Sequence, residues 1–166
     1  MLFWRALAAF LVLPGIVAYG LPLVLARQAL GAPLARPWGL VLVLAGTALL
    51  LACVREFYVA GRGTLAPWSP PKFLVTSGPY RFSRNPMYVA VLTILAGWAT
   101  VFDSRTLLYY LLGAALAAHL RVLWFEEPWA LREFGAAWTE YRARVPRWLP
   151  LPGRAAPRRD TRPPVR

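Results

Sequence analysis

Two short polar stretches hold the residue types in this chain that can do chemistry. The first, residues 78–88, reads GPYRFSRNPMY and combines hydroxyl, guanidinium and amide groups; the second is the adjacent acidic pair Glu126 and Glu127. Only seven of the 166 residues are Asp or Glu, so two of them side by side after a strongly apolar segment need a reason. Together these groups offer both hydrogen-bond donors and acceptors. They predict a binding site for a small polar ligand at a membrane surface.

The elements that must position these groups follow from the apolar segments. Hydrophobic residues make up 58% of the chain and charged residues only 16%, which is outside the balance of soluble domains. A helix needs roughly 20 apolar residues to cross about 30 Å of hydrocarbon. By this measure we predict an all-α integral membrane protein with four transmembrane helices, at residues 4–26, 38–60, 86–102 and 105–125. The last two should form a hairpin, because only a tight turn fits between them.

The first apolar segment has a second interpretation, as a cleaved signal peptide, because Arg5 precedes it. The segment is long for a signal peptide, is interrupted by Pro14 and Pro22, and lacks a convincing small-residue cleavage site after it. We therefore interpret it as a retained transmembrane helix, whose prolines are tolerated as kinks among neighbouring helices.

Arginine and lysine are distributed unevenly between the two sides of the predicted helices. The side that carries both termini holds fourteen of them and the other side three. Since cytoplasmic segments carry the excess of positive charge, both termini are predicted to be cytoplasmic. Anionic lipids at that surface account for much of the net charge of +12, and no basic module of a nucleic-acid-binding kind accompanies it. We expect membrane lipids as partners and no nucleic acid.

The C-terminal part of the chain divides into two. Residues 127–150 are predicted to form an amphipathic helical segment at the cytoplasmic surface, since apolar residues recur every three or four positions; Gly135 is expected to break it. Residues 153–166 contain mainly Gly, Ala, Pro and Arg and are predicted to be a disordered basic tail. The chain should thus have a single domain, residues 1–152, followed by this tail.

The loop before the third predicted helix ends at Asn85 and Pro86. Proline is favoured in the first turn of a helix, and Asn85 is predicted to be the N-cap. One interpretation is that these residues only begin the helix while Arg81 and Arg84 reach lipid phosphates. The other is that the loop binds a ligand.

Two ionisable residues, His119 and Arg121, lie in the fourth apolar segment shortly before the acidic pair. Charges inside hydrocarbon are costly, so such residues usually face a bundle interior or an aqueous cavity. Arg121 can instead extend to the membrane surface, or pair with Glu56 or with one Glu of the acidic pair. No metal site is expected, because the chain has a single histidine and a single cysteine, Cys53.

The ordered set of motifs resembles the isoprenylcysteine carboxyl methyltransferase family and its bacterial relatives, and is similar at a greater distance to phosphatidylethanolamine N-methyltransferases. The resemblance covers about residues 61–150. It rests on GTLAPW at 63–68, GPYRxxRNPMY at 78–88, EEP at 126–128, FG at 134–135, Tyr141 and VPRWLP at 145–150. Many members of that family carry histidine at the position of Asn85.

The resemblance implies a methyltransferase that uses S-adenosylmethionine, with a donor pocket open to the cytoplasm and formed by the last two helices and the C-terminal segment. The residues implied in donor binding are Tyr80, Arg81, Asn85, Pro86, Tyr88, His119, Glu126 and Glu127. Arg84 and Arg121 are the candidates for a catalytic role, in which a guanidinium orients an acceptor carboxylate. Methyl transfer to a carboxylate needs no general base, whereas an amine or thiol acceptor must lose a proton.

The acceptor is expected to be hydrophobic, either lipid-like or prenylated, because a site at the end of a hairpin can be reached from the bilayer as well as from water. The Arg-rich, Lys-poor composition indicates a bacterial protein of the inner membrane. Two other functions remain open. One is a membrane reductase that uses NADPH. The sequence lacks the glycine-rich phosphate-binding motif after a strand, which counts against this function. The other is a scaffold without catalytic activity.

Overall fold

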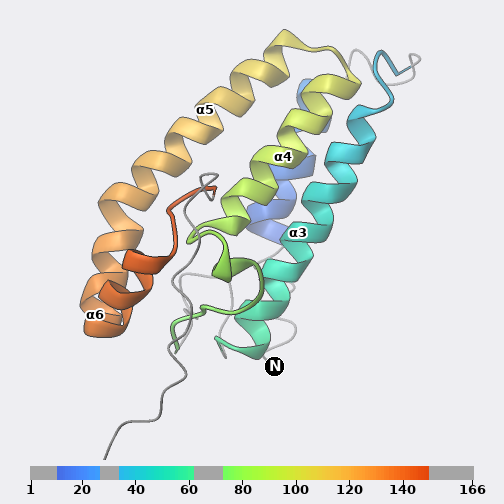
Figure 1. Cartoon of the computed structure of the whole chain (residues 1–166). Coiled ribbons are helices and arrows are strands. Elements are labelled where there is room, and N and C mark those ends of the chain that lie inside the picture. Colours follow the sequence, from blue (N-terminus) through green and yellow to red (C-terminus); the bar gives the residue numbers. More distant parts are fainter. Residues whose placement is uncertain (1–10, 27–33, 62–72, 150–166) are drawn as a thin grey trace, which may run out of the picture.

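The computed structural model describes residues 11–26, 34–61 and 73–149, and these residues form helices and loops without a strand. The predicted all-α class is confirmed for this part of the chain; the tail at 153–166 and the start of the first predicted span lie outside it. In chain order the elements are the π-helix η1 (Leu11–Gly20), α2 (Leu21–Leu25), α3 (Gly39–Val59), the 3-10 turn η3 (Gly78–Arg81), α4 (Pro86–Val101), α5 (Arg105–Arg121), the π turn η4 (Val122–Glu126) and α6 (Glu127–Arg144) (Figure 1).

Two of the described helices are long and apolar enough to cross a membrane. They are α3 and the helical segment Arg105–Arg144, which comprises α5, η4 and α6 and changes direction at Gly135. The apolar helices Pro14–Leu25 and Pro86–Val101 are shorter. α4 is bounded by a proline at its start and a tight turn at its end, so its 16 residues extend only about 24 Å. Of the four helices predicted from the sequence, two therefore reach spanning length in the described residues.

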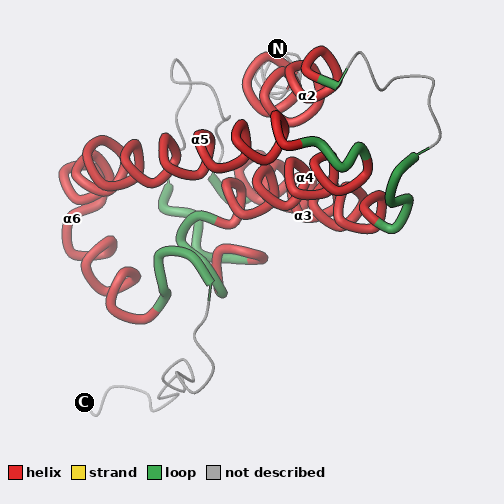
Figure 2. Tube along the Cα trace, turned by 90° about the horizontal axis from the view of Figure 1, so that it is seen from above, coloured by secondary structure: helices red, strands yellow, loops and turns green. Residues whose placement is uncertain are grey.

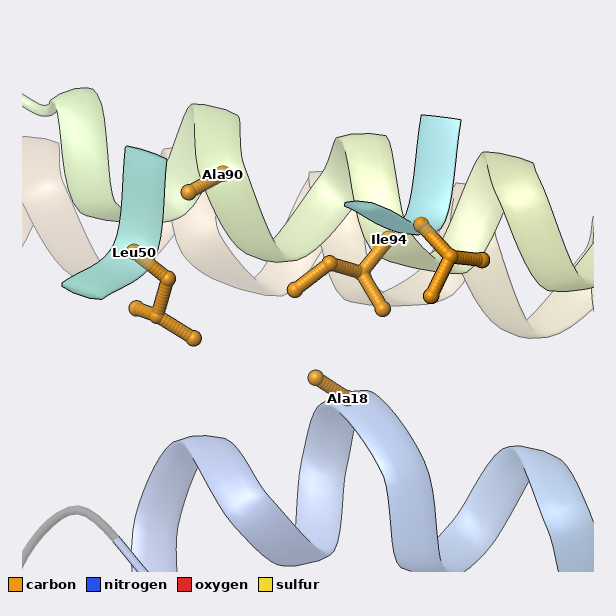
Figure 3. Close-up of a cluster of buried hydrophobic side chains, with 5 residues drawn as sticks. Ala18, Leu50, Ala90 and Ile94 are labelled. Atoms are coloured by element: carbon orange, nitrogen blue, oxygen red, sulfur yellow. The ribbon is translucent and has the colours of Figure 1, made fainter. Parts of the chain in front are cut away.

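α3 and α4 run antiparallel and lie against each other (Figure 1, Figure 2). Glycine permits this approach: a Cβ on Gly46 would lie 2.8 Å from the carbonyl oxygen of Ala90, and a Cβ on Gly97 would lie 2.6 Å from Val43. Small residues allow helix backbones to come this close. The buried cluster here joins both helices to η1 and consists of Ala18, Val43, Leu50, Ala90 and Ile94 (Figure 3).

The turn between α4 and α5 is as tight as predicted. Asp103 has a φ of 45°, and the Ser104 Oγ accepts a hydrogen bond from the Leu107 amide at 3.4 Å, which caps the start of α5. The predicted helical hairpin is therefore confirmed. From this turn α5 diverges from α4 toward α6 (Figure 1).

α6 changes direction at Gly135, whose φ of 51° and ψ of −119° are not helical. Glycine tolerates a positive φ that other residues rarely adopt, so the break expected here is confirmed. Beyond it, Trp138 and Tyr141 form a buried cluster with Ala130 from the first half of the helix. The chain is extended at Val145, directly after α6. We name residues 145–149 the C-terminal strap.

Candidate functional site

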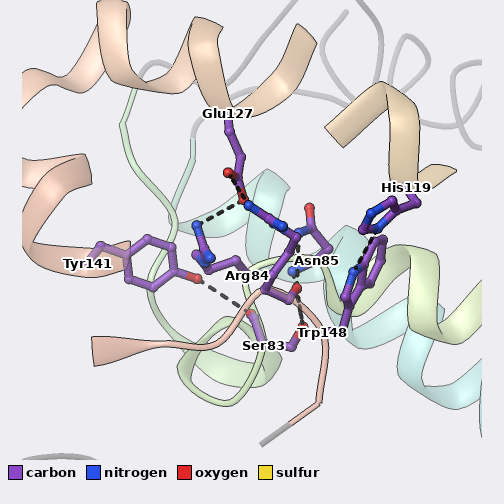
Figure 4. A network of polar contacts seen from close by, with 8 residues as sticks. Ser83, Arg84, Asn85, His119, Glu127, Tyr141 and Trp148 are labelled. Carbon is purple, nitrogen blue, oxygen red and sulfur yellow. Dashed lines mark hydrogen bonds and ion pairs between the residues drawn. The ribbon is translucent and has the colours of Figure 1, made fainter. Parts of the chain in front are cut away.

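Four segments from three parts of the sequence meet at one end of the α4–α5 hairpin. They are the loop that leads into α4, the end of α5 with η4, the first turn of α6, and the C-terminal strap (Figure 4). The loop brings Arg84 and Asn85, α5 brings His119, α6 brings Glu127, and the strap brings Trp148 (Figure 4). Most of the residues implied in donor binding are thus gathered in one cluster.

Glu127 is the centre of an ion-pair network. Its Oε1 accepts hydrogen bonds from Arg84 Nη1 at 2.9 Å and from Arg147 Nε at 2.7 Å, and its Oε2 accepts from Arg147 Nη2 at 2.9 Å. The Arg147 contact is therefore bidentate, which adds geometric specificity to the charge attraction. The side chains of Arg84 and Glu127 are only 11% and 16% exposed. One carboxylate therefore lies between two guanidinium groups in a largely buried place.

The two guanidinium groups on Glu127 have different environments. Burial is the main cause that lowers the pKa of Arg84 below its ordinary value, while Glu127 acts in the opposite direction. The pKa of Arg147 is raised, chiefly by its hydrogen bond to Glu127. Arginine stays protonated over the range in which proteins are folded, so both groups are cations. The cluster around Glu127 carries a net positive charge.

Glu126 has different partners from its neighbour. Its Oε1 accepts hydrogen bonds from Tyr88 Oη at 2.5 Å and from Arg121 Nε at 2.8 Å. Arg121 and Glu126 are five residues apart, a spacing that an α-helix would place on different faces. The π turn η4, with its wider i to i+5 repeat, brings the two side chains together. Of the alternatives for Arg121, the structure thus shows pairing with the acidic pair.

The backbone of the strap is tied to the loop before α4. The Arg84 amide donates to the Pro146 carbonyl at 2.9 Å, and Asn85 Nδ2 donates to the Arg147 carbonyl at 3.0 Å. Asn85 does occupy the position before Pro86, but its side chain makes no cap hydrogen bond. The predicted N-cap position of Asn85 is therefore confirmed, but its side-chain amide holds the strap and does not cap the helix.

His119 and Trp148 connect the strap to α5. Trp148 Nε1 donates to His119 Nδ1 at 3.3 Å, and the two rings are stacked with centroids 5.9 Å apart. Trp148 also meets the ring of Tyr88 edge to face at 6.4 Å. Three aromatic rings from three elements therefore form one wall of the cluster.

Some of the implied site residues lie elsewhere. The side chain of Tyr80 is buried with Cys53 and Val75 against α3, and Arg81 is exposed and lies over the ring of Phe82, 5.4 Å from its centroid. Pro86 is buried at the start of α4. Of Tyr80, only the backbone reaches the cluster, where its carbonyl accepts a hydrogen bond from Tyr141 Oη at 2.7 Å. Neither Tyr80 nor Arg81 presents its side chain to the acidic pair.

The structure adds residues that the sequence analysis did not assign to the site. Arg147 and Trp148 belong to the VPRWLP motif, which marked the resemblance but was interpreted as part of an amphipathic segment. Tyr141 and Trp138 were interpreted as apolar positions of that segment. The available signal was the placement of Arg and Trp between two prolines, where a continuous helix is disfavoured.

Two buried donors in the cluster have no hydrogen-bond partner among the described residues. They are Arg84 Nε and Trp138 Nε1. The Arg84 guanidinium lies over the Trp138 ring, 5.7 Å from its centroid, so the two orphan groups are neighbours. Buried donors are nearly always satisfied, and unpaired ones call for an explanation such as a ligand or an ion.

The fold and the cluster define an all-helical protein with helices of membrane-spanning length and a polar site at helix ends. Residues 34–137 match the phospholipid methyltransferase family, a stretch that runs from the start of α3 into the second half of α6. The match covers well over half of the chain, which therefore belongs to this family of membrane methyltransferases. No curated protein and no solved structure matches the chain. The matching family corresponds to the more distant of the two resemblances found in the sequence.

Proposed function

We propose that this protein is an integral membrane methyltransferase that transfers a methyl group from S-adenosylmethionine to a hydrophobic acceptor. The observation that carries the proposal is the contact of Tyr88 and Arg121 with Glu126. Tyr88 lies in the first turn of α4, so this contact joins the motif at residues 78–88 to the acidic pair across the hairpin, in a chain of a methyltransferase family.

The residues present fit the chemical groups of the donor. Arg84 Nε and Trp138 Nε1 are buried N–H groups without hydrogen-bond partners among the described residues. The carboxylate of S-adenosylmethionine accepts hydrogen bonds from such groups. Glu126 is a carboxylate whose side chain is 36% exposed, so it can accept from an ammonium group or from ribose hydroxyls. The rings of Tyr88, His119 and Trp148 offer apolar surface to an adenine.

The reaction needs little from the protein beyond placement. S-adenosylmethionine supplies a methyl group on a positively charged sulfur. The chain's own residues align the acceptor with that methyl group and exclude water, effects worth about 7–11 kcal/mol when the geometry is well fixed. A carboxylate acceptor is already an anion. For an amine or thiol acceptor, Glu126, Tyr88 and His119 are the candidates for the base that takes its proton, because both oxygens of Glu127 are occupied by arginines.

Arg121 is best placed to meet the acceptor. Its side chain is 62% exposed and lies beside Leu120 and the exposed rings of Trp124 and Phe125 on the outer surface of the helix. A guanidinium among apolar and aromatic side chains suits an amphiphile that arrives from the bilayer with a polar group to orient. We propose a lipid-like or prenylated acceptor. The excess of Arg and Lys on one side supports cytoplasmic termini, and the Arg-rich, Lys-poor composition supports a bacterial inner membrane.

Binding of S-adenosylhomocysteine, the product of the donor, tests the proposal without knowledge of the acceptor. The full chain, purified in dodecyl maltoside, is titrated by calorimetry with S-adenosylhomocysteine and, separately, with NADPH. We expect the first to bind and the second not to bind. Glu126→Gln should weaken binding about tenfold or more, since a hydrogen bond to a charged group is worth about 1.5–3 kcal/mol.

The matched control is Glu140→Gln, which alters an exposed carboxylate of α6 that pairs with Arg144 outside the cluster. This variant should bind S-adenosylhomocysteine as the parent does. Binding of NADPH in place of S-adenosylhomocysteine would favour the reductase. Binding of neither compound would favour the scaffold. Either of these two outcomes, NADPH binding alone or no binding at all, contradicts the proposal.

A further inference from the structure

The two acids of the adjacent pair have different environments, although the sequence presents them as equivalent. The side chain of Glu127 is 16% exposed and its two oxygens accept three hydrogen bonds from two arginines. Glu126 is 36% exposed, and its contacts are made through one oxygen, Oε1. Glu126 therefore has room for a ligand, whereas Glu127 is occupied by protein groups.

The main partner of Glu127 belongs to the C-terminal strap. Arg147 forms a bidentate ion pair with Glu127, and its own carbonyl accepts hydrogen bonds from Asn85 Nδ2 at 3.0 Å and from Ser83 Oγ at 3.3 Å. One residue thus links the start of α6 to the loop before α4. On either side of it, the Pro146 carbonyl holds the Arg84 amide and the Trp148 ring stacks on His119.

We infer that Glu127 and Arg147 are positioning residues, whose ion pair docks the C-terminal strap, and that the docked strap sets the orientation of Arg84, Asn85 and His119 for the donor. This inference rests on the proposed function. According to this inference the two acids have different roles: Glu126 contacts S-adenosylmethionine, whereas Glu127 acts through the strap. The family match ends at residue 137, so the strap is a part of the site that lies beyond the matched region.

The physical basis is the cost of leaving the strap undocked. Residues 145–149 follow the end of α6, so their backbone groups need partners outside a helix. The Arg84 amide and the side chains of Asn85 and Ser83 donate hydrogen bonds to the strap carbonyls only while the strap lies in place. A largely buried carboxylate and a bidentate guanidinium hold it there. Removal of Glu127 leaves two guanidinium groups without their carboxylate, and removal of Arg147 leaves Glu127 with Arg84 alone.

A double-mutant cycle separates positioning from direct contact. Glu127→Gln, Arg147→Gln and the double variant are made in the full chain. The affinity for S-adenosylhomocysteine is measured by calorimetry. Hydrogen exchange of the segments 82–88 and 145–149 is followed by mass spectrometry without any ligand. The affinity depends on the binding site for S-adenosylmethionine, whereas hydrogen exchange without ligand reports only whether the strap is docked.

We expect each single variant to weaken S-adenosylhomocysteine binding about tenfold and to speed exchange in both segments, because each undocks the strap. The double variant should bind about as weakly as Glu127→Gln, because both single variants lose the contact between Glu127 and Arg147 and Glu127→Gln also loses the charge that pairs with Arg84. Arg147→Lys should recover part of the affinity, because an ammonium keeps the charge but lacks the bidentate fork. The cycle of Glu126→Gln with Arg147→Gln should be closer to additive.

Glu140 and Arg144 provide the matched control pair, an exposed ion pair of α6 at 3.1 Å. Their Gln variants should leave both readouts unchanged. If Glu127→Gln weakens binding while exchange at 145–149 stays as in the parent, Glu127 contacts the donor directly and the inference is wrong. If the parent itself does not bind S-adenosylhomocysteine, the proposed function fails first, and the ligand-free exchange data still show whether the ion pair docks the strap.

Discussion

The interface between α3 and α4 and the polar cluster at the end of the hairpin are built on opposite principles. At the first, backbones approach across glycines and the contacts are apolar. At the second, charged and aromatic side chains from four segments join helices that have diverged. The first should therefore be sensitive to volume and the second to charge and hydrogen bonding. Apolar packing across glycines therefore holds α3 and α4 together, whereas ion pairs, hydrogen bonds and aromatic contacts form the candidate site.

The largest effect is expected from added volume between α3 and α4. In Gly97→Leu, the new Cβ would lie 2.6 Å from Val43 Cγ2 and 2.8 Å from the Val43 amide nitrogen, and a backbone atom cannot move aside easily. We expect a loss of about 3 kcal/mol or more, measured by thermal unfolding and by the yield of monodisperse protein.

Gly113→Leu is the control for this change, because a Cβ on Gly113 meets nothing within 4 Å. It should fold as the parent does. Equal damage from both variants would mean that close packing of α3 on α4 is not what distinguishes Gly97.

The charge-sensitive region is tested by Arg84→Met, which keeps much of the aliphatic volume and removes the guanidinium. Because Arg84 is only 11% exposed and pairs with Glu127, we expect a destabilisation of about 3 kcal/mol together with loss of S-adenosylhomocysteine binding. Thermal unfolding and calorimetry measure the two effects. The control is Arg81→Met, at an exposed arginine on the same loop, which should change neither. If the Arg84→Met protein is as stable as the parent and binds S-adenosylhomocysteine normally, the polar cluster is not sensitive to charge as proposed.

The fold-back of α6 belongs to the second region and depends on backbone conformation. Gly135→Ala places a Cβ at a φ of 51° and should cost about 1–3 kcal/mol, although no neighbour is within 4 Å of that Cβ. The comparison is Gly113→Ala in the middle of α5, which should instead stabilise by about 0.5–1 kcal/mol through helix propensity. Thermal unfolding of the two variants should therefore shift in opposite directions. If Gly135→Ala unfolds at the same temperature as the parent or above it, Gly135 is not needed for the turn.

The smallest effect is expected from a single hydrogen bond. Tyr141→Phe removes the donor that satisfies the Tyr80 carbonyl at 2.7 Å and should destabilise by about 1 kcal/mol. Tyr109→Phe, at a position 69% exposed on α5, should have no measurable effect on thermal unfolding. If the two variants unfold alike, the bond between Tyr141 and the loop does not hold α6 against it.

Features local in the chain were predictable. The hairpin turn at Asp103 and Ser104, the start of α4 at Pro86 and the break at Gly135 follow from turn chemistry, helix-start preferences and backbone freedom, which act over a few residues. The pairing of Arg121 with Glu126 could be offered only as one alternative, because it depends on a π turn and not on an α-helical spacing. The role of Asn85 was missed because its partner lies 62 residues away.

The sequence by itself determined that this is a helical protein with apolar segments suited to a membrane, and that rare polar groups gather in two short motifs. Those conclusions depend on composition and on short-range spacing, which a chain carries before it folds. Only the tertiary structure decided which acid meets which arginine, and that Arg147 and Trp148 complete the cluster. Such choices are made by contacts between segments distant in the chain, and side-chain chemistry alone allows several of them.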